Sequence, residues 1–126
     1  MAARIENFEQ LEAWRTAREL VRAAYAFFRR KPAVLDFGLR DQVQRAAVSA
    51  MTNIAEGFER LHPTEKMQFY NVARASCGEV RSLSFVMLDA GYISVTEHEQ
   101  LVSLVTQTGR LLSGLIRSTR SRTGNP

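Results

Sequence analysis

The sequence predicts an all-α fold, an antiparallel up-down-up-down four-helix bundle formed by a single domain. Apolar residues recur at three- and four-residue steps along four segments, and no segment alternates as a strand does. The connectors on either side of the third segment are short, which favours antiparallel neighbours. A chain of 126 residues, 45% of them hydrophobic, is long enough for one domain with a sizeable core.

The first two helices are predicted over residues 8–31 and 38–60. In the first, Leu11 and Trp14 begin an apolar stripe, and Pro32 stops the helix. In the second, three positions of the stripe are alanine, so a neighbouring helix can approach closely.

The last two helices are predicted over residues 64–90 and 95–117. Gly91 supplies a C-terminal stop for the third helix, and Ser94 with Glu97 forms a capping-box pattern at the start of the fourth. Residues 118–126 lack apolar anchors, so we expect them to form a mobile tail.

The charge of the chain is modestly basic and unevenly placed. It holds 17 basic and 13 acidic residues, a net charge of +4, and all but two of the basic residues are arginine. No acidic residue follows Glu99, which makes the C-terminal end basic. Guanidinium groups suit phosphate and carboxylate equally, so this end fits either nucleic acid or an ion-pair network.

A cytoplasmic location is expected from three features. The one cysteine, Cys77, excludes an internal disulfide and reads as a small core residue. The opening residues do not resemble a secretory leader, and the longest uncharged apolar runs are too short to span a membrane. We expect no membrane association.

The predicted helices carry more apolar side chains than one core stripe requires. Residues 85–88 point apolar groups all the way round the third helix, and Phe27 and Phe28 are adjacent in the first. One interpretation is a wide core stripe with a few exposed side chains. The other, which we favour, is a second face buried by self-association.

A polar seam is predicted on one face of the second helix, with residues at three- and four-residue steps: Arg45, Ser49, Asn53, Glu56 and Arg60. Antiparallel pairing with the third helix brings Arg45 level with Glu79 and Ser49 level with residues 75–76. We therefore expect an Arg45–Glu79 ion pair and a hydrogen bond from Asn53 to a neighbour. The seam fixes helix register or subunit contacts; an active site would also need a nucleophile or a base.

Catalysis and metal binding are not expected. Di-iron bundles need two Glu-x-x-His motifs, and this chain has one match, residues 59–62, at a helix end. His62 and His98 are expected at the surface, and Tyr25 and Tyr70 are expected to be packing anchors. No phosphate-binding glycine loop or catalytic triad pattern is present, so no cofactor is predicted.

Residues 38–49 (GLRDQVQRAAVS) and 53–60 (NIAEGFER) carry a resemblance to a known family. The chain resembles the bacterial four helix bundle proteins. That family includes proteins encoded in intervening sequences of large-subunit ribosomal RNA genes and the accessory variability determinant of diversity-generating retroelements. The resemblance implies a cytoplasmic, non-enzymatic, barrel-like homopentamer with a basic surface. Retroelement members bind nucleic acid and engage a reverse transcriptase, so both are candidate partners.

The favoured hypothesis is therefore a homopentamer that binds nucleic acid through arginines. The first candidate group lies at the basic end: Arg110, Arg117, Arg120 and Arg122. A second group lies along the first helix: Arg15, Arg18 and Arg22. The alternative is a protein-interaction scaffold whose arginines serve intersubunit ion pairs, and an enzyme, such as a nuclease, ranks third.

Overall fold

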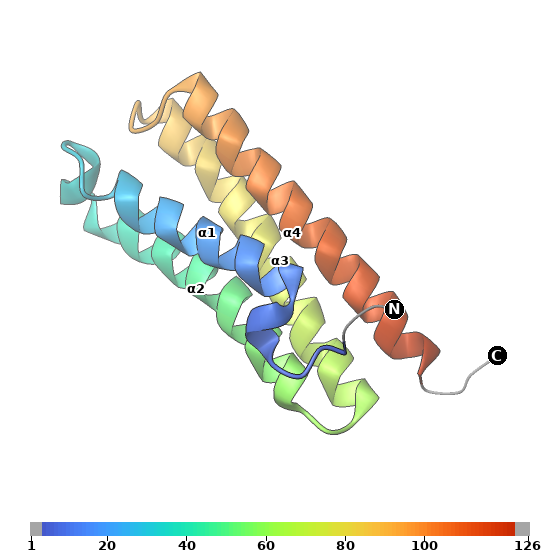
Figure 1. Ribbon diagram of the computed structural model, residues 1–126. Coiled ribbons are helices and arrows are strands. Elements are labelled where there is room, and N and C mark those ends of the chain that lie inside the picture. The colour runs from blue at the N-terminus through green and yellow to red at the C-terminus, as the bar shows by residue number, and fades with distance from the viewer. Residues whose placement is uncertain (1–3, 123–126) are drawn as a thin grey trace.

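The computed structural model describes residues 4–122 and confirms the all-α four-helix bundle (Figure 1). Its four long helices are α1 (Glu12–Phe27), α2 (Phe37–Glu59), α3 (Pro63–Asp89) and α4 (Val95–Ser121). Two short 3-10 turns, η1 (Phe8–Gln10) and η2 (Ala33–Leu35), precede α1 and α2. No strand occurs between residues 4 and 122.

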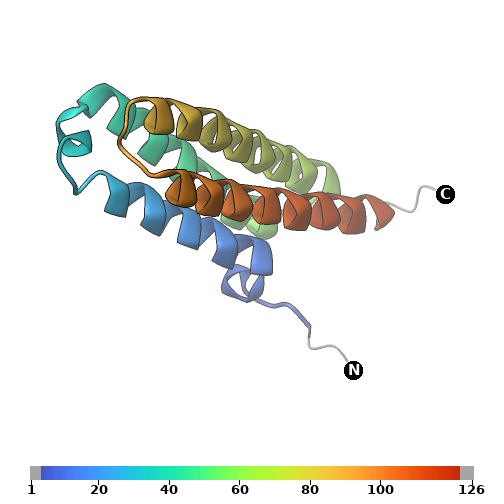
Figure 2. The same ribbon diagram turned by 90° about the horizontal axis from the view of Figure 1, so that it is seen from above.

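The helices are arranged so that each packs against its neighbours in the chain. The α2–α3 and α3–α4 pairs make the most extensive contacts, and α1 lies against both α2 and α4 (Figure 2). The outer face formed by α1 and α2 is therefore opposite the outer face formed by α3 and α4. The core between them is largely Ala, Leu, Val and Ile.

The first helix is shorter than the predicted 8–31. The amide of Asn7 donates to Gln10 Oε1 at 2.9 Å, which closes η1 as a separate turn. Leu11 then adopts an extended backbone, with φ −73° and ψ 128°, and its side chain enters the core. At the other end Phe28 leaves the helical conformation with its side chain 2% exposed, so α1 ends before the predicted Lys31.

The predicted start of the mobile tail at residue 118 is wrong, because α4 continues four residues past the expected end at Arg117. Thr119 is 4% exposed, and its Oγ1 donates to the Leu115 carbonyl oxygen at 2.8 Å. A buried, hydrogen-bonded threonine therefore anchors the last turn without an apolar side chain. Residues 123–126 of the expected tail lie outside the described residues.

The corner between α3 and α4 forms as predicted. Gly91 has φ +77°, and the Tyr92 amide donates to the Met87 carbonyl oxygen at 2.9 Å, which completes a Schellman cap. The capping box of Ser94 and Glu97 is present at the start of α4. These caps satisfy backbone groups that the two helix ends leave unpaired.

Polar contacts join this corner to the α1–α2 connection. Arg30 Nη1 donates to Glu97 Oε2 at 2.6 Å, and Arg30 Nη2 donates to the Tyr92 carbonyl oxygen at 2.8 Å. The Tyr92 hydroxyl donates to Asp36 Oδ2 at 2.9 Å, and Asp36 also caps α2. One end of the bundle is therefore closed by contacts between its two connections, α1–α2 and α3–α4.

The burial of the tyrosine, histidine and cysteine side chains agrees in part with the predictions from the sequence. Tyr70 and Cys77 are each 2% exposed, as expected of core residues. Tyr25 is 42% exposed and is not a core anchor. His98 is 9% exposed, not on the surface as expected, because its ring packs edge-on against Phe85 at 4.5 Å between centroids.

Candidate nucleic-acid interface

A groove with a volume of about 510 Å³ runs between α3 and α4 on the outer face of the bundle. Four exposed arginines line it, two from each helix: Arg74, Arg81, Arg110 and Arg117. No acidic residue lines it within residues 4–122. We call this surface the basic groove.

The guanidinium groups of the four arginines make no ion pair or hydrogen bond with any described residue. Four other arginines of the bundle do form ion pairs with carboxylates, as Arg30 does with Glu97. The guanidinium groups of the basic groove keep all of their donors for another molecule.

The arginines are spaced along the groove at regular levels. Arg74 and Arg81 are two helical turns apart, about 10.5 Å, and the same interval separates Arg110 from Arg117. Phe85 contacts His98 across the two helices, and counting from that contact places Arg74 level with Gly109, one residue before Arg110. The charges therefore occupy three levels over roughly 22 Å, with Arg81 and Arg117 at the ends.

The floor of the groove is left open by two glycines. A Cβ built at Gly78 or Gly109 would meet no atom within 4 Å. Glycine inside a helix costs about 1 kcal/mol relative to alanine, and no close helix contact requires it at either position. The glycines instead bring the helix backbone within reach of a molecule bound between the arginines.

Cys77 and Val105 lie beneath the glycines and make the floor apolar. Burial raises the pKa of the Cys77 thiol to about 11, so the thiol is protonated and unreactive near neutral pH. The groove thus offers positive charge and open backbone, and its thiol is not a thiolate.

The groove continues toward the C-terminal end of α4. An adjoining hollow of about 380 Å³ shares Arg74 with it and is lined further along by Arg120. This hollow is also free of acidic side chains in the described part of the chain. Three of the four predicted basic-end arginines, Arg110, Arg117 and Arg120, are therefore brought along one surface.

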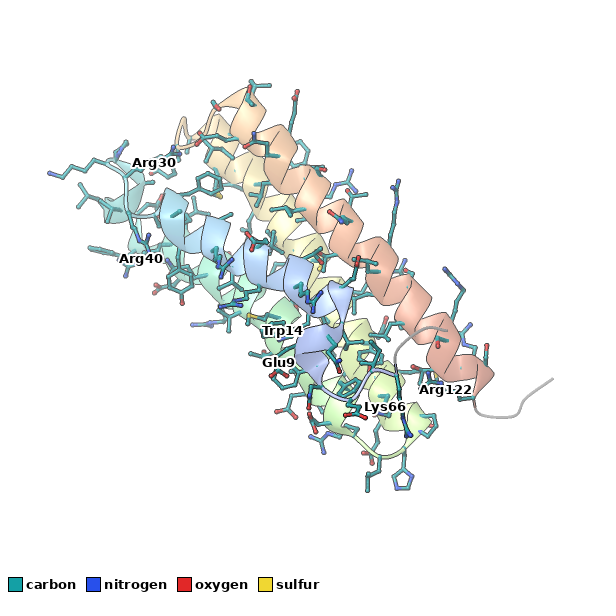
Figure 3. All side chains as sticks on the ribbon, viewed as in Figure 1. Glu9, Trp14, Arg30, Arg40, Lys66 and Arg122 are labelled. Carbon is teal, nitrogen blue, oxygen red and sulfur yellow. The ribbon has the colours of Figure 1, made fainter. Side chains whose placement is uncertain are left out.

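Arg122 lies elsewhere, in a cavity beside Lys66 at the end of the bundle where α2 passes into α3 (Figure 3). Arg122 does not line the basic groove, although it follows Arg120 by only two residues in the chain.

The second predicted group lies on α1, away from the basic groove. Arg15 Nε donates to the Glu9 carbonyl oxygen at 2.8 Å, and the Arg18 guanidinium lies 5.7 Å from the centre of the Trp14 ring. Arg22 forms an ion pair with Glu19. Each of these arginines has a local partner, so this surface is less suited to phosphate than the groove is.

The polar seam forms only in part. Ser49 and Ser76 share a hydrogen bond of 2.8 Å between their hydroxyl oxygens, which confirms the predicted register. Asn53 Nδ2 donates to the Ser49 carbonyl oxygen at 2.8 Å, as expected. Glu56 pairs with Arg60 on the same helix at 3.3 Å.

The predicted Arg45–Glu79 ion pair is wrong. Both side chains are exposed, and no ion pair joins them. At this level the line of contact between α2 and α3 is occupied by buried Ala46 and Val80. Arg45 and Glu79 stand on the outer shoulders of the two helices, so equal height along the bundle does not bring them together.

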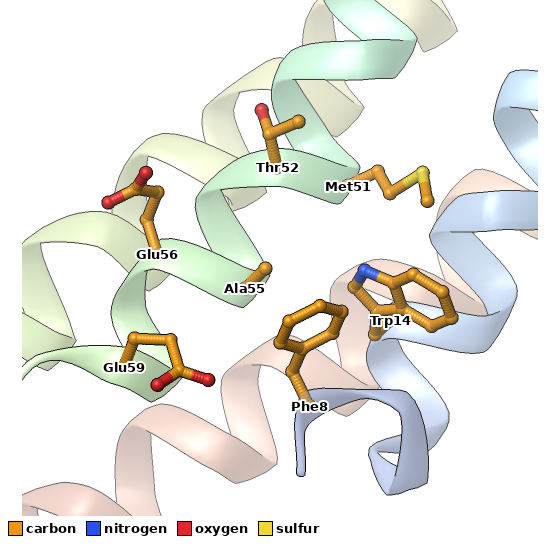
Figure 4. A pocket seen from close by; sticks show the side chains of 7 residues that line it. All are labelled: Phe8, Trp14, Met51, Thr52, Ala55, Glu56 and Glu59. Atoms are coloured by element: carbon orange, nitrogen blue, oxygen red, sulfur yellow. The ribbon is translucent and has the colours of Figure 1, made fainter.

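The opposite face of the bundle has a pocket of different chemistry. Its volume is about 370 Å³, and its lining is mostly apolar, with two carboxylates at its edge (Figure 4): Phe8, Trp14, Met51, Thr52, Ala55, Glu56 and Glu59. The Phe8 and Trp14 rings lie 5.2 Å apart. We call it the acidic-rimmed pocket, and its charge makes it unsuited to phosphate.

Sequence reasoning missed Arg74 and Arg81. The available signal was the seven-residue spacing of the pair with Gly78 between them, which matches Arg110, Arg117 and the neighbouring Gly109 on α4. Among residues 4–122 no cluster of three or more His, Cys, Asp or Glu side chains could hold a metal ion. No helix of the described chain combines the length and apolar character that crossing a membrane requires.

Comparison with known proteins places the fold in a family. The model of the 23S rRNA-intervening sequence proteins matches residues 9–114. The chain belongs to this family. A crystal structure of a Bacteroides thetaiotaomicron VPI-5482 protein of unknown function, from the S23 ribosomal protein family, has the same fold with a TM-score of 0.74. It is 18% identical, and the match covers 82% of this chain and 97% of that one. No curated protein matches the chain.

Proposed function

We propose that this intervening-sequence family protein is a non-enzymatic, cytoplasmic homo-oligomer that binds nucleic acid through the basic groove. The observation that carries the proposal is the set of four unpaired arginines along a groove without acids. The family name refers to 23S rRNA, so RNA is the first ligand to test. The groove has no element that reads bases, so binding should tolerate different sequences.

Self-association is supported by apolar surface that the bundle does not bury. Val72, Phe85 and Val86, all on α3, are 48–49% exposed. Phe85 and Val86 are adjacent, and contiguous exposed apolar side chains commonly mark an interface between subunits. The family resemblance supplies the number five, and a ring of five chains of +4 each would carry +20. A reverse transcriptase partner stays a prediction from the same resemblance.

A second candidate function is a protein scaffold in which the arginines serve contacts between subunits. The acidic-rimmed pocket favours it, because Glu56 and Glu59 lie on the face opposite the basic groove. A groove of one chain could then receive the acidic face of the next. In this arrangement the groove arginines would pair with carboxylates of the neighbouring chain, and the protein would show no salt-sensitive RNA binding.

Titration of a labelled single-stranded RNA by fluorescence anisotropy over a range of salt concentrations separates the two functions. Replacing both Arg74 and Arg110 by alanine should weaken binding about tenfold or more at low salt. The slope of log affinity against log salt should fall by about 1.4, since each lost phosphate contact contributes about 0.7.

The matched control is the α1 pair Arg18→Ala/Arg22→Ala, which removes the same charge from the second candidate group. It should leave affinity within about twofold, because those arginines are engaged locally. Equal losses in both double variants would assign binding to net charge rather than to the groove. No RNA binding by the wild type, together with a smaller particle for Arg74→Ala/Arg110→Ala in light scattering, would favour the scaffold.

A further inference from the structure

A second cavity, about 640 Å³ in volume, lies at the end of the bundle where α2 passes into α3 and α4 ends. Three cationic side chains line it, Arg4, Lys66 and Arg122, and no acidic side chain lines it in the described part of the chain. Figure 3 shows Lys66 and Arg122 at this end. We call it the end cavity.

Lys66 is held in place by the backbone. Its Nζ donates to the Phe58 carbonyl oxygen at 2.6 Å and to the Gly57 carbonyl oxygen at 3.4 Å. An ammonium group has three donors, so one remains for a ligand. Burial lowers the pKa of Lys66, and nearby Arg122 lowers it further, although Glu59 acts in the opposite direction. The two cations thus repel each other, and an anion between them would relieve that repulsion.

Tyr70 contributes a hydroxyl that opens onto the cavity. The side chain is 2% exposed and lines the cavity, yet its hydroxyl makes no hydrogen bond to any described residue. Burial raises the pKa of Tyr70 to about 12, so the hydroxyl stays neutral and can donate. The hydroxyl is accessible from the cavity, so it can donate to an acceptor bound there.

The placement of Tyr70 depends on Gly57. A Cβ at position 57 would lie 2.6 Å from Tyr70 Cε1, so only glycine lets the ring lie this close to α2. Two hydroxyls of α4 complete the polar lining: Ser118 and Thr119. Thr119 Oγ1 already donates to Leu115, so it can only accept from a ligand.

The remaining lining is apolar, from Ile5, Leu11, Phe58 and Leu115. We propose that the end cavity binds a phosphate monoester, carried by the end of a nucleic-acid strand or by a free mononucleotide. A monoester has about −1.5 to −2 charge and three acceptor oxygens, which suits three cations and the Tyr70 hydroxyl. The apolar walls leave room for the attached nucleoside.

The strand-end form of this proposal rests on the proposed function. Arg120 lines the continuation of the basic groove, and Arg122, which follows the last residue of α4, lines the end cavity. A strand that follows the groove toward this end of the bundle therefore reaches the cavity. An internal phosphodiester has chain on both sides and a single charge, so it fits the cavity less well than a terminal phosphate.

The test compares RNA oligonucleotides of one sequence with a 5′-phosphate, a 3′-phosphate or only hydroxyl ends. We expect at least tenfold tighter binding of one phosphorylated form, and loss of that preference in Tyr70→Phe and in Arg122→Gln. Tyr70→Phe keeps the ring and removes only the hydroxyl. Arg110→Ala, in the basic groove, should weaken all three oligonucleotides and keep the preference.

Calorimetry with adenosine monophosphate against adenosine examines the cavity without a strand. Mononucleotide binding that Tyr70→Phe weakens, without any preference among the RNAs, would assign the cavity to free nucleotides. Equal affinity for all three RNAs and no mononucleotide binding would overturn the proposal while leaving the basic groove intact. Mononucleotide binding without RNA binding would instead refute the groove and support the cavity.

Discussion

Replacing Gly57 by alanine probes the packing of α2 against α3 with a single methyl group. The new Cβ would lie 2.6 Å from Cε1 and 2.8 Å from Cδ1 of Tyr70, and 3.1 Å from Cβ of Phe69. Carbon atoms in favourable contact are about 3.5–4.0 Å apart. Relief therefore requires α2 and α3 to separate locally or the buried Tyr70 ring to leave its place.

The magnitude follows from two opposing terms. Overpacking of this kind costs about 1–3 kcal/mol, and alanine in a helix interior gains about 1 kcal/mol over glycine. Gly78→Ala supplies a matched control, because its Cβ would meet nothing within 4 Å and only the favourable term remains. The two variants should therefore differ by about 1–3 kcal/mol in the free energy of unfolding, with Gly57→Ala the less stable.

Urea unfolding followed by circular dichroism measures this difference. Both variants and the wild type should be compared at one protein concentration, because the stability of an oligomer depends on concentration. In thermal unfolding the gap corresponds to about 3–5 °C per kcal/mol for a chain of this size. If Gly57→Ala proved as stable as Gly78→Ala, the close approach of Tyr70 to α2 would be refuted.

Two further predictions concern titratable groups. The hydrogen bond from Arg30, then that from the Ser94 amide, lowers the pKa of Glu97 below its ordinary 4.5. The folded state therefore binds this proton less readily than the unfolded chain, so the stability from Glu97 is complete above pH 4.5 and is lost as pH falls through the lowered pKa. Between pH 6 and pH 3 the melting temperature of the wild type should fall further than that of Glu97→Gln. Parallel plots of melting temperature against pH for the two proteins would contradict this. Cys77 is 2% exposed with a pKa of about 11, so iodoacetamide at pH 8 should label the folded protein at least about a hundredfold more slowly than the urea-unfolded one. Equally fast labelling of the folded protein would show that the groove floor is open.

The fold was predictable because its signal is local and repeated. Helical periodicity identified four helices, and counting back from the α2–α3 turn placed Ser49 level with Ser76, where the hydrogen bond is found. The same counting failed for Arg45 and Glu79. Height along a bundle follows from counting residues, whereas side-chain direction depends on which neighbours occupy the line of contact, here Ala46 and Val80.

The candidate site was harder to predict because it joins two helices. A run of basic residues near the C-terminus drew attention to α4, but its groove is completed by Arg74 and Arg81 of α3, which stand on either side of Glu79 in the sequence. The end of α4 was missed for a related reason. Thr119 is a polar residue in a core position, and its burial follows from tertiary packing rather than from apolar periodicity.

The short string at residues 53–57 acquires a physical meaning from these contacts. Asn53 binds the preceding turn, Ile54 is fully buried, and Gly57 makes room for Tyr70. The carbonyl oxygen of Gly57 also accepts from Lys66, so the string sets two groups of the end cavity as it sets the packing of α2 on α3. Likeness in this string therefore identifies the bundle and the end cavity. The groove arginines, which no packing contact requires, carry the proposed function separately.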